Sequence, residues 1–283
     1  TGLGVGSYIV TVTDTLGCTD TANIAIAQPS VLSASIASQT NVSCFDGNNG
    51  AATVAVAGGT TPYTYVWNTS PVQTGAAANA LVAGSYNVTV TDAKGCTANV
   101  SVTISQPTKL SLSLSAKTNA SCNGINNGTA TVAATGGTSP YTYWWNTTPI
   151  QTSAGATALA AGSYIAIATD NAGCKDTLAV VISQPYALSA NISSKTNTRC
   201  FGEANGSATV SVSGGTSPYT YVWNTTPVQT TPTASGLAAG TYIATVTDAG
   251  GCNDTALVVI AQPAMLNAGV SASTNISCFG GSN

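Results

Sequence analysis

The residues that could do chemistry in this chain of 283 amino acids are its eight cysteines. They form two series with a constant interval of 78 residues: Cys18, Cys96, Cys174 and Cys252, and Cys44, Cys122, Cys200 and Cys278. Neighbouring cysteines are alternately 26 and 52 residues apart, unlike the close Cys-x-x-Cys pairs of zinc sites. In a chain without histidine, this pattern favours structural disulfides formed in an oxidising compartment.

The remaining composition argues against catalysis and nucleic-acid binding. Without histidine, neither the Ser-His-Asp and Cys-His systems nor imidazole-ligated zinc can form, and the nine carboxylates are scattered. Charged residues make up 5% of the chain and the net charge is −3, so no basic patch can hold phosphates. No apolar run approaches the ~20 residues of a membrane helix, and no signal peptide or anchor is visible. We expect no enzyme, no cofactor, no metal site, no nucleic-acid partner and no membrane insertion in this segment.

The cysteines belong to a tandem repeat of one small domain. The segment Gly58–Asn68 returns as Gly136–Asn146 and as Gly214–Asn224, at the same interval of 78 residues. A Gln-Pro pair also recurs, and a proline after a β-rich run marks the end of a strand. We therefore place boundaries after Pro29, Pro107, Pro185 and Pro263. The expected domains are the C-terminal strands of a preceding repeat at 1–29, complete repeats at 30–107, 108–185 and 186–263, and the first strand of a following repeat at 264–283.

Each repeat carries the signals of a small β-sandwich. Residues 32–36, 51–57 and 63–67 alternate as strands do, and 68–80 has room for a short edge strand and a loop. The segment Leu81–Tyr86 resembles the tyrosine corner of immunoglobulin and fibronectin type III sandwiches, in which the phenol hydroxyl bonds upstream backbone. Counting seven strands per repeat, we predict tandem immunoglobulin-like, Greek-key β-sandwich domains stacked end to end as a rod or fibre, each adding about 35 to 45 Å.

Two disulfide patterns are compatible with this fold. Cys44 would lie at the pole of its sandwich that faces the following repeat and Cys96 at the opposite pole, whereas a disulfide needs Cα atoms within about 7 Å. We therefore favour bonds between neighbouring repeats, Cys44–Cys174 and Cys122–Cys252. The alternative is bonds within each domain, which would stabilise a small core by about 2 to 4 kcal/mol: Cys44–Cys96, Cys122–Cys174 and Cys200–Cys252.

Other residue types offer weaker candidates. Tyr63, Tyr65 and Trp67 lie on one side of their strand, and we expect them in the core rather than in a sugar-binding platform. Trp144 lies on the opposite face of the equivalent strand and is a candidate for an exposed contact. The turn at 46–49 holds polar oxygens, but the other repeats do not keep its carboxylate, so we expect no repeated calcium site.

The motif Gly-Gly-Thr-x-Pro-Tyr-Thr-Tyr-x-Trp, followed by Leu-x-Ala-Gly-x-Tyr and Val-Thr-Asp-x-x-Gly-Cys, resembles the repeats of the SprB family. These are very large surface adhesins of gliding Bacteroidota, exported by the type IX secretion system. The resemblance implies an extracellular filament at the cell surface, moved by the gliding machinery, with the gliding and secretion machinery as partners.

The same resemblance implies O-glycosylation at Asp-Ser/Thr followed by a small or aliphatic residue. Matching triplets place candidates at Thr21, Thr177 and Thr255, and also at Thr15, which lies in a tight turn. The remaining repeat departs from the motif, because it reads Thr97-Ala98-Asn99. The alternative is an ordinary Asp-Thr pair at the start of a strand.

The sequence thus predicts a structural shaft of a secreted adhesin filament for surface attachment and gliding. Its partners would be neighbouring repeats and, beyond the chain, like filaments or surface polysaccharide. The alternative functions are a repeated polysaccharide-binding module and a spacer of a large secreted protein.

Overall fold

The computed structural model describes residues 2–273 and 279–280. All regular elements in these residues are β-strands, from β1 to β20, and there is no helix among them. The strands form small antiparallel sheets. The predicted all-β class is therefore confirmed.

The chain divides into two compact units, and the division passes through the middle sequence repeat. One unit comprises residues 1–113, 134–143 and 167–177, and the other comprises 114–133, 144–166 and 178–283. Each unit therefore contains one complete repeat, at 30–107 or at 186–263, together with part of the middle one.

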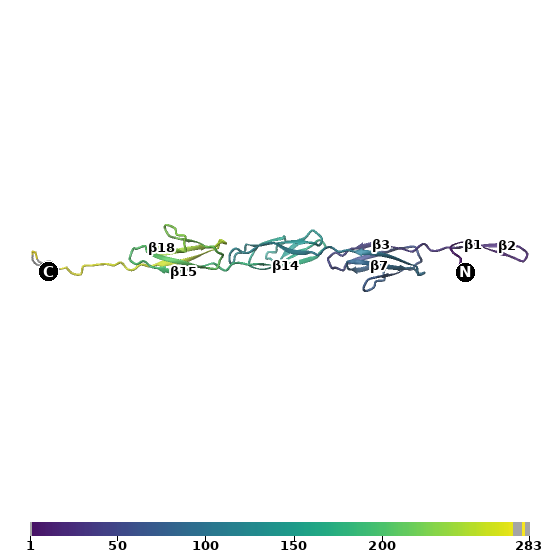
Figure 1. Ribbon diagram of the computed structural model, residues 1–283, viewed down its shortest axis with the longest axis horizontal. Coiled ribbons are helices and arrows are strands. Elements are labelled where there is room, and N and C mark those ends of the chain that lie inside the picture. The colour runs from purple at the N-terminus through teal and green to yellow at the C-terminus, as the bar shows by residue number, and fades with distance from the viewer. Residues whose placement is uncertain (1, 274–278, 281–283) are drawn as a thin grey trace. The chain divides into compact units, whose positions relative to one another are not determined.

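In the first unit, residues 30–107 form a sandwich of two three-stranded sheets, with β3 and β7 in different layers (Figure 1). One sheet has the order β3-β4-β6 and the other the order β5-β7-β8. The strands are β3 (Ser33–Thr40), β4 (Gly50–Ala57), β5 (Thr64–Trp67), β6 (Ala77–Leu81), β7 (Gly84–Thr91) and β8 (Thr97–Ile104). This immunoglobulin-like order agrees with the prediction, but the expected count of seven strands was wrong, because the structure has six.

The missing edge strand is a loop, residues 68–76, that side chains hold in place. Trp67 donates its indole N–H to the carbonyl of Gly75 at 3.0 Å. Gln73 donates Nε2 to the carbonyl of Asn79 and accepts the amide of Asn79 at Oε1, both at 2.9 Å. The hydroxyl of Thr69 accepts the amide of Gln73 at 3.0 Å. These bonds satisfy backbone groups that a strand would have paired with a neighbouring strand.

The core of this sandwich follows the period-two alternation of its strands. Trp67, Val88 and Val90 are fully buried between the sheets, as the alternation predicted for the indole. The predicted tyrosine corner is also present, since Tyr86 donates its phenol O–H to the carbonyl of Val82 at 3.1 Å. The later repeats form the same bond, from Tyr164 to Ala160 at 3.0 Å and from Tyr242 to Ala238 at 3.1 Å.

The glycine pair that opens the repeated segment has a steric reason. Gly58 has φ of 71°, and a Cβ placed there would lie 2.1 Å from the carbonyl oxygen of Val31. The phenol of Tyr63 donates to the carbonyl of Gly58 at 2.7 Å. Only glycine allows this close approach between the turn and the start of the repeat.

The other two repeats have the same six strands. In the middle repeat the sheets are β12-β10-β9 and β11-β13-β14, and in the last they are β15-β16-β18 and β17-β19-β20. The strands are β9 (Ser111–Thr118), β10 (Gly128–Thr135), β11 (Thr142–Trp145), β12 (Gly155–Leu159), β13 (Gly162–Thr169), β14 (Lys175–Ile182), β15 (Ser189–Thr196), β16 (Gly206–Ser213), β17 (Thr220–Trp223), β18 (Thr233–Leu237), β19 (Gly240–Thr247) and β20 (Asn253–Ile260).

The two ends of the chain carry parts of the same pattern. An antiparallel hairpin precedes the first complete repeat, formed by β1 (Gly6–Thr13) and β2 (Thr19–Ile26). Residues 264–273 and 279–280 form no strand, and the other residues of the strand expected at 264–283 lie outside the described residues, Cys278 among them.

Candidate functional site

The candidate site is the joint, by which we mean the place where the cysteine loop of one repeat meets the hairpin turn of the next. The cysteine loops follow the first strand of each repeat, at 41–49, 119–127 and 197–205. The hairpin turns join the last two strands, at 92–96, 170–174 and 248–252. Each element carries one cysteine, so the geometry of both decides which disulfides form.

The cysteine loop is closed by its own asparagine. In the first repeat the amide of Ser43 donates to Oδ1 of Asn49 at 3.0 Å, and Nδ2 of Asn49 donates to the hydroxyl of Ser43 at 2.7 Å. The amide of Gly47 donates to the carbonyl of Cys44 at 3.0 Å. Such side-chain closure is typical of Asn in turns, and it holds Cys44 at the surface in a defined position.

A glutamine anchors this loop to the end of the sandwich. Oε1 of Gln106 accepts the amide of Asp46 at 2.8 Å. Gln184 and Gln262 accept the amides of Gly124 and Gly202 in the same way, at 2.8 and 2.9 Å. The recurrent Gln-Pro pair predicts only a strand end and a domain boundary, and this role of its glutamine was missed. Its recurrence in phase with the cysteines was the available signal.

The hairpin turn is organised by a buried aspartate. In the middle repeat Oδ1 of Asp170 accepts the amides of Ala172 and Cys174 at 2.9 and 2.8 Å, and Oδ2 accepts the amide of Thr138 at 2.8 Å. Asp92 and Asp248 make the equivalent bonds in their own repeats. All three side chains are buried. The sequence pattern did not reveal that these carboxylates orient the cysteines.

The charge on these carboxylates is stabilised by the backbone. Burial by itself raises the pKa of Asp170, but the hydrogen bonds from backbone amides, with that of Thr138 the strongest, outweigh it. The pKa therefore lies below its ordinary value, and the same balance lowers the pKa of Asp92 and Asp248. The turn is thus built around an ionised carboxylate at neutral pH.

Two disulfides connect successive repeats. Cys44 is bonded to Cys174 with sulfurs 2.04 Å apart, and Cys122 is bonded to Cys252 with sulfurs 2.01 Å apart. In both pairs the Cα atoms are 5.7 Å apart and the cysteines are 130 residues apart in the chain. Each bond lies within one of the two compact units. Among the described residues Cys18, Cys96 and Cys200 are free and exposed.

The bonds considered within single domains, Cys44–Cys96 and its equivalents, are not formed. The reason is the length of the last strand. The loop that carries Cys44 is bonded to Gln106, whereas Cys96 immediately precedes β8. Extended chain over these ten residues spans roughly 33 Å. A disulfide cannot cover that distance.

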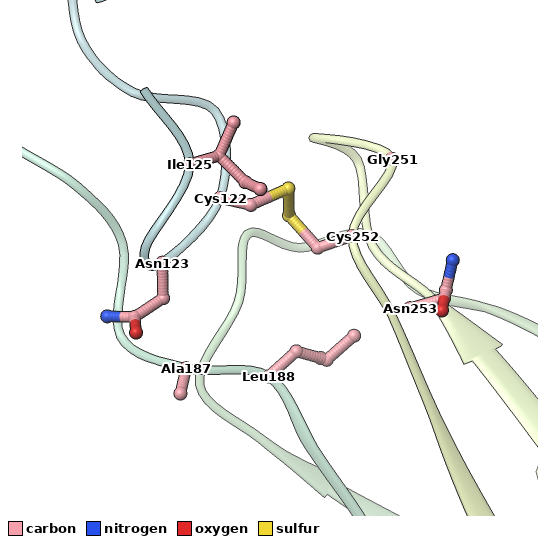
Figure 2. Close-up of a pocket in the computed structure, with 8 residues that line it drawn as sticks. All are labelled: Cys122, Asn123, Ile125, Ala187, Leu188, Gly251, Cys252 and Asn253. Atoms are coloured by element: carbon pink, nitrogen blue, oxygen red, sulfur yellow. A yellow bond between two sulfur atoms is a disulfide. The ribbon is translucent and has the colours of Figure 1, made fainter. Parts of the chain in front are cut away.

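The two joints differ in the side chains around the disulfide. At the first joint is a cavity of about 340 Å³, lined by Cys44, Phe45, Asp46, Lys109, Leu110, Cys174, Lys175 and Asp176. At the second joint is a cavity of about 380 Å³, lined by Cys122, Asn123, Ile125, Ala187, Leu188, Gly251, Cys252 and Asn253 (Figure 2). The first joint therefore contains four charged residues and the second contains none, although the chain has few charges to place.

The candidate glycosylation sites lie outside the joints and point to solvent. Thr15, Thr21, Thr177 and Thr255 are all exposed. The aspartates that precede two of them have another role: Asp176 accepts the amide of Leu112 at 2.7 Å and Asp254 accepts that of Ala190 at 2.8 Å. These bonds tie the last strand of the sandwich to the first, so the triplets also have a structural reason. Glycosylation stays a prediction.

The aromatic candidates separate as expected. Trp67, Trp145 and Trp223 are fully buried, while Trp144 has 38% of its surface exposed. Tyr63 and Tyr65 are partly buried and pack against the core. No cluster of three metal-ligating side chains occurs in residues 2–273 and 279–280. In the same residues no helix is long and apolar enough to cross a membrane.

The fold and the joints define a class of protein: a tandem array of immunoglobulin-like β-sandwich repeats in which disulfides link neighbouring repeats. The family model described as the SprB repeat matches residues 36–72, 114–148 and 192–227. The family model therefore matches once in each of the three complete repeats. Each match begins in the first strand of a repeat and ends after the buried tryptophan, and so does not include the hairpin turn.

No curated protein matches the chain. Among solved structures, it is similar to three N-terminal domains of the outer capsid protein Hoc of bacteriophage RB49, at 13% identity and a TM-score of 0.38, covering 81% of this chain and 97% of that one. It is also similar to the eight N-terminal immunoglobulin domains of Down syndrome cell adhesion molecule, at 12% identity and a TM-score of 0.39, covering 92% of this chain and 40% of that one. A tetra-tandem repeat of a large adhesion protein matches at 15% identity and a TM-score of 0.32, covering 92% of this chain and 83% of that one. At these TM-scores the similarities say nothing about what this chain binds.

Proposed function

We propose that the chain is a tension-bearing shaft segment of a large secreted cell-surface adhesin filament, used in attachment and gliding. The observation that carries this proposal is that both disulfides cross from one repeat to the next. A bond inside a domain stabilises that domain, whereas a bond across a joint holds two domains together when either one opens. The second arrangement suits a chain that is pulled along its length.

The chemistry of the surface supports the same role. Disulfides persist in oxidising surroundings, which fits an extracellular location. The exposed strand positions are rich in Thr, Ser and Asn and carry few charges, so the surface offers little for nonspecific ionic contacts. The shaft would act mechanically and without catalysis. Its repeats would extend as a rod, with boundaries after Pro29, Pro107, Pro185 and Pro263, and its external partners would be the gliding and secretion machinery.

Peptide mapping without reduction tests the architecture that this role needs. Trypsin cuts after Lys94 and Lys109 and releases Cys96 on the short peptide 95–109. With the bonds of the structure, this peptide is recovered alone with an alkylated thiol. Peptides 1–94, 118–175 and 200–283 are then recovered as one linked species. Recovery of 95–109 linked to 1–94 would instead show Cys44–Cys96 bonds and independent domains, and would refute the proposed shaft.

A second candidate function, a polysaccharide-binding module, is favoured by one observation. Trp144 is exposed on the outer face of its sheet, and Ile165 and Val181 of the same sheet are also exposed. A flat aromatic ring on a face that also carries aliphatic side chains suits stacking against a sugar. Glycan-array binding by the chain that is lost in Trp144→Ala, and kept in the matched surface variant Val66→Ala, would favour this candidate. Binding that both variants retain would exclude Trp144 as the contact.

A further inference from the structure

The surface that receives a cysteine loop at both joints is also present on the first complete repeat. Cys96 corresponds to Cys174 and Cys252 by the 78-residue interval, and among the described residues its thiol is free and exposed. Cys96, Asp92 and Gly59 line a cavity of about 410 Å³ together with residues 28–32. This surface is here called the open pole.

The open pole has the same hydrogen-bonded frame as the two joints. Oδ1 of Asp92 accepts the amides of Lys94 and Cys96 at 2.9 Å, and Oδ2 accepts the amide of Thr60 at 2.9 Å. At the first joint the floor of the cavity includes Leu110, which is 5% exposed. Its equivalent Leu32 lines the open pole and is only partly buried. The receptor half of a joint is therefore formed without the loop that would cover it.

The complementary half is a short segment whose turn is held by local bonds. In the three cysteine loops the amides of Ser43, Ser121 and Arg199 donate to the side chains of Asn49, Asn127 and Asn205 at 3.0, 3.0 and 3.1 Å. Because these bonds join residues six positions apart, a peptide of one loop contains both of their partners. Figure 2 shows such a loop at the second joint, where the disulfide and Leu188 line the same cavity.

We propose that the open pole is an acceptor site for the cysteine loop of one further repeat of this sequence type. The inference rests on the proposed function, because it assigns to the open pole the partner that the shaft uses at its joints. Its chemistry is thiol–disulfide exchange. The thiolate of Cys96 attacks the loop sulfur of a mixed disulfide between the loop and glutathione, a new disulfide forms, and glutathione leaves as a thiolate that takes up a proton. No net oxidation occurs.

The test uses the full chain with both joints oxidised, and a synthetic peptide of residues 40–50 whose Cys44 is held as a mixed disulfide with glutathione. The chain contains its own control, because Cys18 lies in an equivalent turn: Asp14 accepts the amides of Leu16 and Cys18 at 2.9 Å. Cys18 is also free and exposed, but it does not line the cavity. Trypsin separates the two thiols, on peptides 1–94 and 95–109.

For each cysteine, the rate of modification by the peptide is divided by the rate at which glutathione disulfide modifies the same cysteine. We expect this normalised rate to be at least about tenfold higher at Cys96 than at Cys18, because docking raises the effective concentration of the loop sulfur. A scrambled peptide of the same composition should abolish the preference, and Leu32→Ala should reduce it without changing the rate at Cys18. Equal normalised rates at Cys18 and Cys96, or a preference that the scrambled peptide keeps, would overturn the inference. If the peptide map shows Cys44–Cys174 and this test fails, the acceptor site is wrong and the stapled shaft stands; if the map lacks that bond, the shaft itself is wrong.

Discussion

The bonds between repeats limit how far the chain can be stretched, and the limit can be calculated from their positions. Without disulfides the covalent path from Thr1 to Asn283 includes every residue. With both bonds, the shortest path runs to Cys44, crosses to Cys174, returns to Cys122, crosses to Cys252 and continues to the end. The segments 1–44, 122–174 and 252–283 then carry the tension, and they amount to about 126 residue steps of about 282.

The difference is large enough for single-molecule force spectroscopy with handles at the two ends. At roughly 3.4 Å per residue, the fully extended oxidised chain measures about 430 Å and the reduced chain about 960 Å. Reduction should therefore add about 530 Å of contour length. A reduced chain no longer than the oxidised one would show that the bonds are absent.

Single cysteine variants separate the two disulfide patterns, which give the same total for the intact chain. Cys96→Ser should leave the oxidised contour length unchanged, since Cys96 is free. Cys44→Ser should lengthen it by about 26 residues, or roughly 90 Å, because only the Cys122–Cys252 bond remains. With bonds inside each domain, both variants would instead add about 52 residues, or roughly 180 Å. Lengthening of the Cys96→Ser chain would refute the connectivity and the mechanical argument built on it.

Three further predictions concern the frame of the repeats. Because the pKa of Asp92 is lower in the folded chain, its stabilising effect is complete above the ordinary carboxyl pKa of about 3.9 and is lost as the pH falls through the lower, folded value. The free energy of unfolding of residues 30–107, measured by hydrogen exchange, should therefore fall in that range of pH. Asp92→Asn should lower this free energy at pH 7 and flatten its dependence on pH. Gly58→Ala should lower the free energy of unfolding in urea by at least about 2 kcal/mol, because its Cβ would meet the carbonyl of Val31. Gly95→Ala is the control: Gly95 has φ of 84° with open space around it, so this change should cost only about 1 kcal/mol. Equal losses would contradict the steric explanation. Trp67→Ala should cost about 3 to 5 kcal/mol in the same assay, since the ring is fully buried, and a loss below 1 kcal/mol would show that the core collapses around it.

The parts of the fold that sequence could predict are those that depend on local periodicity. Alternation along residues 63–67 placed Trp67 in the core, and the Leu-x-Ala-Gly-x-Tyr motif placed the tyrosine corner. The seventh strand was wrong because residues 68–76 are held by the side chains of Trp67, Thr69 and Gln73. Such bonds join particular side chains to particular backbone groups, so hydrophobic alternation does not reveal them.

The candidate site was only half predictable for the same reason. Sequence identified the cysteines and showed that Cys44 and Cys96 would lie at opposite poles, but it missed the glutamines that anchor the cysteine loops and the buried charge of the aspartates. Gln106 and Asp92 act on residues about 60 and 32 positions away, on Asp46 and Thr60. Contacts of that range depend on how the strands pair.

The sequence by itself determined the repeat length, the phase of the cysteines and the alternation that buries one face of each strand, because all three are periodic along the chain. The tertiary structure decided between the two disulfide patterns that the sequence left open. Cys44 has a candidate partner in its own repeat, Cys96, and another in the next repeat, Cys174, and it is bonded to Cys174. A disulfide needs two Cα atoms within about 7 Å, and only the packing of one repeat against the next brings Cys44 that close to Cys174.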